Sequence, residues 1–311
     1  MGPRPRSDRR RVDGVLLLDK PRGLGSNAAL QIVRRLYRAE KTGHTGTLDP
    51  LATGLLPLVF GEATKFGACL LEADKTYVAE IALGTTTTTG DAEGEVLERR
   101  PVTATRADVE RVVCRFQGAI VQVPPMYSAL KRDGRPLYAY ARAGESVERA
   151  PRTVTIHALE IDAFEGEQLG VTVRCSKGTY VRVLAEDIGR ELGCGAHLAG
   201  LRRTAIGRFR VAEALTLLEL ERLSPADRDA HLWPVDALVG DLPAVSLAAD
   251  AAERFAHGHA IDAALERPGS VRVYRAGAVF LGTGEVGPAG TLHPRRLIRQ
   301  EPRPRAVETA P

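Results

Sequence analysis

The sequence predicts an α+β fold in which a large first part is followed by a small β-rich part. Predicted strands and helices follow one another without the repeated βαβ rhythm of a doubly wound sheet. From about Asp241 the chain changes to short, glycine-rich strand segments such as SVRVYRAGAVFLGTGEV. No internal repeat of about 20 to 50 residues is evident. We therefore expect one mixed unit of strands and helices and a second, smaller domain.

The first elements follow from hydrophobic patterns near the N-terminus. VLLL at 15–18 is typical of a buried strand. Ser26 or Asn27 then caps a helix that runs to about Tyr37, with its apolar residues at helical spacing. A second helix is expected over 62–72. The large part therefore begins as strand, helix and helix.

Later elements are indicated by alternation and by capping residues. KTYVAEIALG at 75–84 alternates like a strand, and Thr105 to Asp108 form a capping-box signature before a helix. Further strands are expected near 118–123, 153–164 and 169–175, and a further helix over 179–192. In that last helix Val183, Leu184 and Ile188 are expected to face inward.

The chain divides into segments of different composition. Residues 124–152 are basic, rich in tyrosine and bounded by prolines, and they look inserted between two strands. The main domain is expected over 12–240 and the second domain over 241–300. The ends, 1–11 and 301–311, are expected to be disordered tails, the first of them basic.

Composition favours an ordinary globular protein of the cytoplasm. The 311 residues are 44% hydrophobic, and the longest apolar runs are far shorter than the roughly 20 residues of a spanning helix, so no membrane segment is expected. The N-terminus lacks the apolar core of a signal peptide. Four cysteines without CxxC spacing fit reduced thiols in a cytoplasm.

Positive charge is concentrated locally. Residues 1–11 contain five arginines and one aspartate, a net charge equal to the formal +4 of the whole chain, so the rest is neutral on balance. Local basic clusters remain in three places: Arg34, Arg35, Arg38 and Lys41; Lys131, Arg132 and Arg135; Arg202, Arg203, Arg208 and Arg210. Such clusters suit phosphate binding, and they equally suit solvated helix faces and loop ends.

The segment GHTGTLDPLATG at 43–54 is built to present one carboxylate. Its glycines permit backbone angles closed to other residues, and Pro50 biases Asp49 toward an extended conformation. An arginine beside such a carboxylate keeps it ionised and oriented, and Arg182 is the candidate partner. The alternative is that Asp49 only ties its own turn.

Other chemistries lack their motifs. No HExxH, His/Cys pairing or EF-hand spacing indicates a metal site, and GxxxxGK[ST] and GxSxG are absent. A glycosidase needs a second carboxylate, for which Glu62 and Asp91 are available without being singled out. Tyrosines next to cations, such as Tyr77 after Lys75 and Tyr180 before Arg182, suit stacking on a base beside a phosphate.

A set of motifs in one order resembles the bacterial tRNA pseudouridine-55 synthase family, called TruB. They are GVLLLDKPRGLGSN at 14–27, GHTGTLDPLATGLLPL at 43–58, GEATKF at 61–66, DKTY at 74–77, PPMYSALK at 124–131, CSKGTYVRVL at 175–184 and LGCGAHLAGLRR at 192–203. The resemblance covers about residues 13–240 strongly and the C-terminal part loosely.

The resemblance implies a role for individual residues. Asp49 matches the family's catalytic aspartate, Tyr77 the tyrosine that stacks on the target base, and Arg182 the arginine paired with the aspartate. Two further residues, Tyr180 and Leu201, match residues that line the uracil pocket.

Two more matches concern the surroundings of the site. His44 resembles the histidine that engages the T loop of tRNA as the nucleotide leaves its stack. Lys20, followed by Pro21, matches a motif packed beside the active-site loop, and we count it among the substrate-binding residues. One departure is Thr88, which stands where the family usually has an aspartate, although Asp91 remains.

The resemblance also implies fold and partners. The family's fold has a mixed central sheet with an active-site cleft, a thumb-like insertion, here 124–152, and a small PUA-like C-terminal domain that binds RNA. The implied substrate is the T-arm stem-loop of tRNA, whose target base flips out for reaction. The implied enzyme is a monomer that needs no metal, organic cofactor or protein partner. The alternatives are a guide-RNA-dependent pseudouridine synthase and a tRNA-binding folding assistant.

Overall fold

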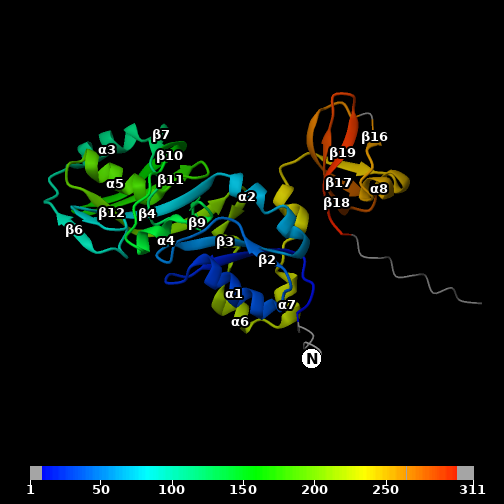
Figure 1. Cartoon of the computed structure of the whole chain (residues 1–311), viewed down its shortest axis with the longest axis horizontal. Coiled ribbons are helices and arrows are strands. Elements are labelled where there is room, and N and C mark those ends of the chain that lie inside the picture. Colours follow the sequence, from blue (N-terminus) through cyan, green and yellow to red (C-terminus); the bar gives the residue numbers. More distant parts are fainter. Residues whose placement is uncertain (1–8, 264, 300–311) are drawn as a thin grey trace, which may run out of the picture.

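A mixed sheet forms the centre of the protein, and a smaller sheet follows it (Figure 1). The computed structural model describes residues 9–263 and 265–299. Within them the central sheet has ten strands in the order β14-β1-β3-β12-β4-β11-β10-β7, with β2 added to β3 and β13 to β12. These strands are β1 (Gly14–Lys20), β2 (Thr42–His44), β3 (Thr53–Phe60), β4 (Lys75–Leu83), β7 (Gly118–Gln122), β10 (Arg152–Glu165), β11 (Gln168–Cys175), β12 (Ala196–Ile206), β13 (Phe209–Arg210) and β14 (Leu215–Thr216). The predicted α+β class is confirmed.

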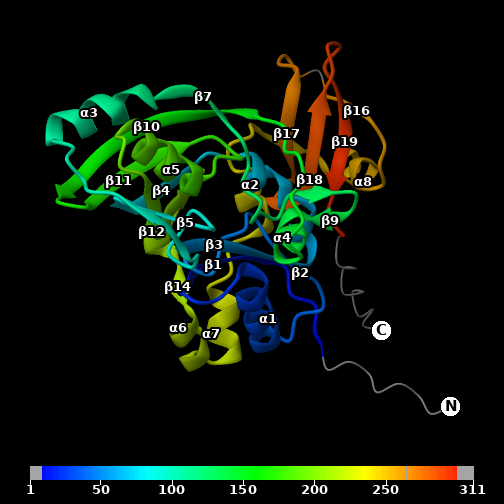
Figure 2. The ribbon, with the colours of Figure 1, turned by 60° about the vertical axis from the view of Figure 1, so that its left-hand side comes forward.

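Helices and short elements surround this sheet. They are α1 (Ser26–Tyr37), η1 (Gly61–Lys65), α2 (Ala68–Glu72), β5 (Thr85–Thr87), β6 (Val96–Arg99), α3 (Arg106–Arg115), α5 (Val181–Glu191), η2 (Val211–Glu213), α6 (Leu217–Arg222), α7 (Pro225–Ala230) and η3 (Val235–Val239). Figure 2 shows α1, α6 and α7 together beside β1. Because side chains alternate along a strand, Leu16 and Leu18 of β1 pack in the cluster that contains α1, whereas Val15 and Leu17 pack in the cluster that contains α2 and η3.

Several expected elements have different ends. The expected helix over 62–72 is two pieces, η1 and α2, separated at Phe66 and Gly67, because glycine weakens a helix interior. The cap of α1 is Gly25 instead of Ser26 or Asn27. In α5, Val181 is buried where Val183 was expected. The capping box at Thr105 is confirmed.

The insertion over 124–152 leaves the sheet between two paired strands, as expected. It follows β7 and ends at β10, which pair in antiparallel register, and it contains β8 (Lys131–Arg132), β9 (Arg135–Pro136) and α4 (Leu137–Arg142). We call residues 124–152 the thumb. Figure 2 shows α4 and β9 beside the ribbon of β3, away from α3.

The C-terminal part is a separate five-stranded sheet with one helix. Its elements are β15 (Ala244–Leu247), α8 (Ala249–Ala256), β16 (Ile261–Asp262), β17 (Gly269–Arg275), β18 (Val279–Val286) and β19 (Thr291–Leu297). Helix α8 was missed by the sequence analysis. Phe280 of this part packs on Phe66 of the main domain, with ring centroids 5.6 Å apart, and the Tyr274 hydroxyl donates to Asp236 at 2.6 Å.

The two ends of the chain lie mostly outside the described residues. Of the predicted tails, 1–11 and 301–311, residues 1–8 and 301–311 lie outside the described residues. Arg10 was counted in the first tail, and there the prediction is wrong. Its guanidinium pairs with Asp229 at 2.5 Å, and its backbone N–H donates to the Arg38 carbonyl at 2.7 Å. Among the described residues, no helix has the length and apolarity needed to cross a membrane.

Candidate active site

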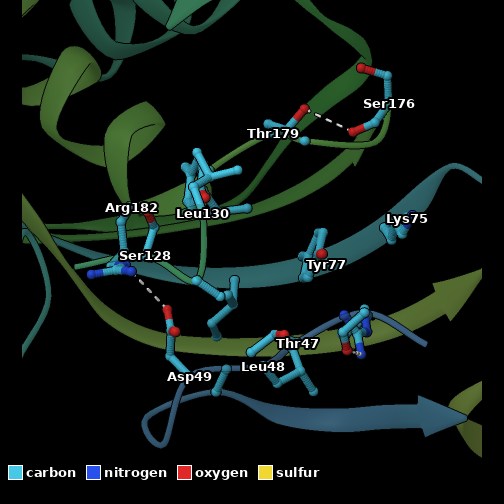
Figure 3. A pocket seen from close by; sticks show the side chains of 18 of the residues that line it. Thr47, Leu48, Asp49, Lys75, Tyr77, Ser128, Leu130, Ser176, Thr179 and Arg182 are labelled. Atoms are coloured by element: carbon cyan, nitrogen blue, oxygen red, sulfur yellow. Dashed lines mark hydrogen bonds and ion pairs between the residues drawn. The ribbon is translucent and has the colours of Figure 1, made fainter. Parts of the chain in front are cut away.

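A pocket of about 570 Å³ lies where β3, β12 and β4 run side by side (Figure 3). Its walls come from the loop over 46–52, from β4 and β12, from the thumb and from the start of α5. Five of the predicted site residues line it: Asp49, Tyr77, Tyr180, Arg182 and Leu201. Residues far apart in the sequence therefore meet in one cavity, as the resemblance implies.

Asp49 and Arg182 form an ion pair at the edge of this pocket. Nη2 of Arg182 lies 3.0 Å from Oδ2 of Asp49, and Figure 3 shows the two side chains facing each other. The arginine is buried, whereas the aspartate is partly exposed. Partial burial raises the pKa of Asp49, and the positive charges of Arg182 and Lys20 oppose that rise. The predicted partnership between this aspartate and this arginine is thus present.

The Asp49 loop is held from behind by α1. Ser26 is buried. Its Oγ accepts the Leu48 N–H at 2.7 Å, and its hydroxyl donates to the Leu48 carbonyl at 3.0 Å. The Gly23 N–H donates to the carbonyl of Pro50 at 2.8 Å. Ser26 therefore anchors the loop instead of capping the helix, and Asp49 is fixed between two tethered neighbours.

A second carboxylate holds Arg182 from the other side. Oδ2 of Asp91 lies 3.3 Å from Nη1 of Arg182, and Asp91 is only 2% exposed. Its other oxygen accepts the Thr89 hydroxyl at 2.6 Å and the Glu93 N–H at 3.1 Å. Asp91 thus orients the arginine from a buried position behind it. It is not the opposed second carboxylate of the glycosidase alternative.

Arg182 also reaches the thumb. Its Nη2 donates to the carbonyl of Tyr127 at 2.6 Å, and its Nη1 donates to the carbonyl of Thr89 at 3.1 Å. One guanidinium therefore joins two carboxylates to two backbone segments. Thr88, the residue that departs from the family pattern, precedes Thr89 in the chain. Its Oγ1 accepts the Glu95 N–H at 3.0 Å, within the hairpin formed by β5 and β6.

Aromatic and apolar side chains form the remainder of the pocket. Tyr77 and Leu201 each pack against two of the core clusters of the main domain. Burial raises the pKa of Tyr77, so its phenol is neutral near pH 7. The guanidinium of Arg152 stacks 4.8 Å from the ring centre of Tyr180. The pocket thus combines two aromatic rings with one carboxylate.

Lys20 does not line this pocket. Its side chain is fully buried, and its Nζ donates to the carbonyls of Pro21 at 3.0 Å and Leu24 at 2.6 Å. Burial lowers its pKa to about 8. It holds the turn whose Gly23 supports the Asp49 loop. The predicted direct contact between Lys20 and substrate is therefore not possible from this buried position.

His44 is not among the residues that line the pocket; it lies in β2, opposite Leu58 of β3. Its Nδ1 is buried and has no hydrogen-bond partner among the described residues. Burial, and secondarily the charge of Arg203, lower its pKa, so the imidazole is neutral near pH 7. Its predicted contact with RNA stays a prediction.

Arg203 corrects the prediction of a basic surface cluster over 202–210. Its side chain is only 1% exposed and donates from Nε to the carbonyl of Leu55 at 2.8 Å. Phosphate cannot reach it there. Arg203 lies against Gly46 and Gly54 of the Asp49 segment. The sequence does not show this proximity, because it follows from the register of β12 with β3. In residues 9–263 and 265–299 no group of three or more His, Cys, Asp or Glu is placed to hold a metal ion.

Comparison with known proteins agrees with this geometry. Three family models match in succession: TruB family pseudouridylate synthase (N terminal domain) at 34–181, tRNA pseudouridylate synthase B C-terminal domain at 182–240, and Pseudouridine synthase II TruB, C-terminal, at 243–298. A protein of Azoarcus sp. strain BH72 named tRNA pseudouridine synthase B is 59% identical, covering 93% of this chain and 96% of its own length. One of Methylobacillus flagellatus with the same name is 54% identical, covering 94% and 97%.

Solved structures share the fold. The crystal structure of a Cbf5-Nop10-Gar1 complex contains a chain with a TM-score of 0.68 and 27% identity, covering 89% of this chain and 79% of that one. A chain of an H/ACA RNP bound to a substrate RNA has a TM-score of 0.70 at 24% identity, covering 92% and 85%, and shows the fold alone. The pseudouridine synthase fold expected from the sequence is confirmed. With its paired aspartate and arginine in one pocket and its match to these relatives over nearly its whole length, the chain belongs to the TruB family of pseudouridine synthases.

Proposed function

We propose that this protein isomerises uridine 55 in the T loop of tRNA to pseudouridine, with Asp49 as the catalytic carboxylate and without metal or organic cofactor. The observation that carries the proposal is the Asp49–Arg182 ion pair in a pocket that also contains Tyr77, Tyr180 and Leu201. The choice of tRNA is supported by the names of relatives that are 54 to 59% identical over most of the chain.

The reaction needs one ionised carboxylate and no redox partner. The N1–C1′ bond breaks, the uracil turns, C5 bonds to C1′, and the proton on C5 is lost while N1 gains one, so atoms and electrons balance. Asp49 serves by adding either to the base or to C1′ of the ribose. In both cases its oxygen is the nucleophile, and Arg182 keeps the carboxylate charged and orients it through Oδ2. Among the described residues no hydrogen bond is donated to Oδ1, which is therefore available for attack.

The aromatic side chains position the flipped base. Extracting a nucleotide from a structured loop costs about a few kcal/mol, which stacking offsets. Tyr77 is the stacking partner of the uracil, and Tyr180 and Leu201 close the pocket around it. His44, neutral and with its Nδ1 unpaired among the described residues, contacts the T loop as the nucleotide leaves.

Cations outside the pocket bind the RNA backbone. Lys131 and Arg132 of the thumb are exposed, and Arg135 beside them is half-buried. We assign the domain over 241–300 to RNA binding as a PUA-like module and the catalytic role to 12–240. The enzyme acts as a cytoplasmic monomer on the T-arm stem-loop and requires no protein partner.

The test is pseudouridine mapping on an unmodified tRNA transcript. The wild-type protein should convert uridine 55 alone, and Asp49→Asn should give no product while it still binds the transcript. Asp229→Asn is the matched control, because this aspartate pairs with Arg10 and is absent from the pocket lining. An active Asp49→Asn protein, or product at another uridine, contradicts the proposal.

The same transcript and the same Asp49→Asn variant distinguish the proposal from two alternatives. A guide-RNA-dependent synthase would be inactive on the bare transcript. A folding assistant would refold a misfolded transcript equally well with Asp49→Asn. Retained folding activity in that variant together with lost isomerisation means that both roles are present.

A further inference from the structure

Arg203 is a buried cation without an acidic partner. Its guanidinium donates to the carbonyls of Leu55 at 2.8 Å and Gly46 at 3.0 Å, and its charge opposes the burial-raised pKa of the Tyr77 phenol. No Asp or Glu of residues 9–263 and 265–299 forms an ion pair with it. Burying a charge among neutral dipoles is unfavourable compared with an apolar side chain of the same size, so packing alone does not account for an arginine here.

The strand register places Arg203 between the two halves of the site. On β12 it is the direct partner of Tyr77 on the antiparallel neighbour β4. On its other side it is the partner of Gly54 on the parallel neighbour β3. Arg203 therefore pairs with the strand that carries the stacking tyrosine. It pairs equally with the strand that begins after the Asp49 loop.

Two glycines of the Asp49 segment make room for it. A Cβ on Gly54 would come within 2.9 Å of the backbone nitrogen of Arg203, and one on Gly46 would lie 3.4 Å from its Nη1. Gly46 and Gly54 precede and follow Asp49, so the loop is closed on Arg203 at both ends. Its carbonyl contact at Gly46 lies only three residues before the carboxylate.

We propose that Arg203 is a positioning residue that sets Tyr77 and the Asp49 loop relative to each other, acting on the phenol of its strand partner Tyr77 and through the Gly46 carbonyl. The inference rests on the proposed isomerisation of uridine. Because Arg203 is 1% exposed, it acts on the base through Tyr77. The forked guanidinium is essential to this role, since a lysine Nζ offers one donor centre where the carbonyls of Leu55 and Gly46 accept from two different nitrogens.

The experiment compares two neighbouring arginines on β12. Arg203→Lys keeps the charge and loses the fork, whereas Arg202→Lys is the matched control, since Arg202 pairs with Asp19 at 2.7 Å and does not line the pocket. Arg203→Lys should lower single-turnover kcat about 10- to 100-fold, the effect of a displacement on the order of 1 Å. The Kd for the tRNA transcript should change less than about threefold, as expected when contacts made only in the transition state are lost. Arg202→Lys should leave both within about twofold of the wild type.

A double-mutant cycle distinguishes positioning from support of the fold. Tyr77→Phe keeps the ring and removes only the hydroxyl, so in its background Arg203→Lys should cost at least about threefold less in kcat than it does alone. Effects that multiply fully would overturn the proposal, as would a kcat for Arg203→Lys within about twofold of the wild type.

Tyr77→Phe alone keeps the proposal testable if Arg203→Lys does not fold. It should lower kcat at least about fivefold with tRNA affinity kept, and a kcat equal to that of the wild type overturns the proposal. An inactive wild-type protein would instead refute the proposed function. The two failures are thus distinguishable.

Discussion

Replacing Gly54 by alanine should destabilise the main domain more than the same change at a matched glycine. Gly54 has φ +97°, and Gly118, at the start of β7, has φ +90°. A Cβ at Gly118 has no heavy atom within 4 Å, whereas one at Gly54 lies 2.9 Å from the Arg203 nitrogen and overlaps its carbonyl oxygen. The two sites therefore share a left-handed backbone and differ in free space.

The expected magnitudes follow from these two terms. A side chain in the left-handed region costs on the order of 1–3 kcal/mol, which both variants incur. Gly54→Ala adds the cost of moving β3 away from β12, typically about 1–3 kcal/mol for an overpacked interior. Gly118→Ala should thus lower the free energy of unfolding by about 1–3 kcal/mol, and Gly54→Ala by about 2–6 kcal/mol.

Urea unfolding followed by tryptophan fluorescence measures this difference in the main domain. The chain has one tryptophan, Trp233, whose ring packs edge-on against Phe209 at 5.5 Å. Gly46→Ala extends the series, because its Cβ would make an ordinary contact at 3.4 Å and should behave like Gly118→Ala. The reasoning is refuted if Gly54→Ala unfolds with the same free energy as Gly118→Ala.

Three further predictions concern charge and base positioning. Arg182→Gln removes the main opponent of the burial-raised pKa of Asp49, so the acid limb of the kcat–pH profile should move to higher pH, and an unmoved limb contradicts the ion-pair role. Tyr77→Ala should reduce kcat more than tRNA affinity, checked by single turnover against filter binding. The pKa of Lys20 falls from 10.5 to about 8 on folding, so the folded state loses its proton first and stability should rise with pH between these values. Urea unfolding at pH 7 and pH 9.5 should show a smaller gain in Lys20→Met than in the wild type, because the pKa of Lys75, also lowered to about 8 by burial, still contributes in the variant.

Local patterns predicted the strands β1, β4, β7, β10 and β11 and the helices α1, α3 and α5, but not the strands β3 and β12 beside the pocket. Alternation found β4, β10 and β11, and the Thr105 capping box was confirmed in detail, because each depends on residues a few positions apart. The same local reasoning missed α8 and joined η1 to α2. The break between η1 and α2 falls at Phe66 and Gly67, where glycine weakens the helix and Phe66 packs on Phe280 of the C-terminal part.

The sequence by itself determined that Asp49 is presented by a glycine- and proline-constrained loop, and the order of its motifs identified the family. It did not determine what Ser26, Lys20, Asp91 and Arg203 do. Ser26, Asp91 and Arg203 bond to groups brought near them by the fold, as Arg203 does to a carbonyl 157 positions away, whereas Lys20 is buried by the fold and bonds to its own turn. Tertiary structure decided their roles, because a buried polar side chain must find its partners wherever the register of the strands places them. Gly54, which looked like a turn residue, thus proves to be the space that the backbone of β12 at Arg203 requires.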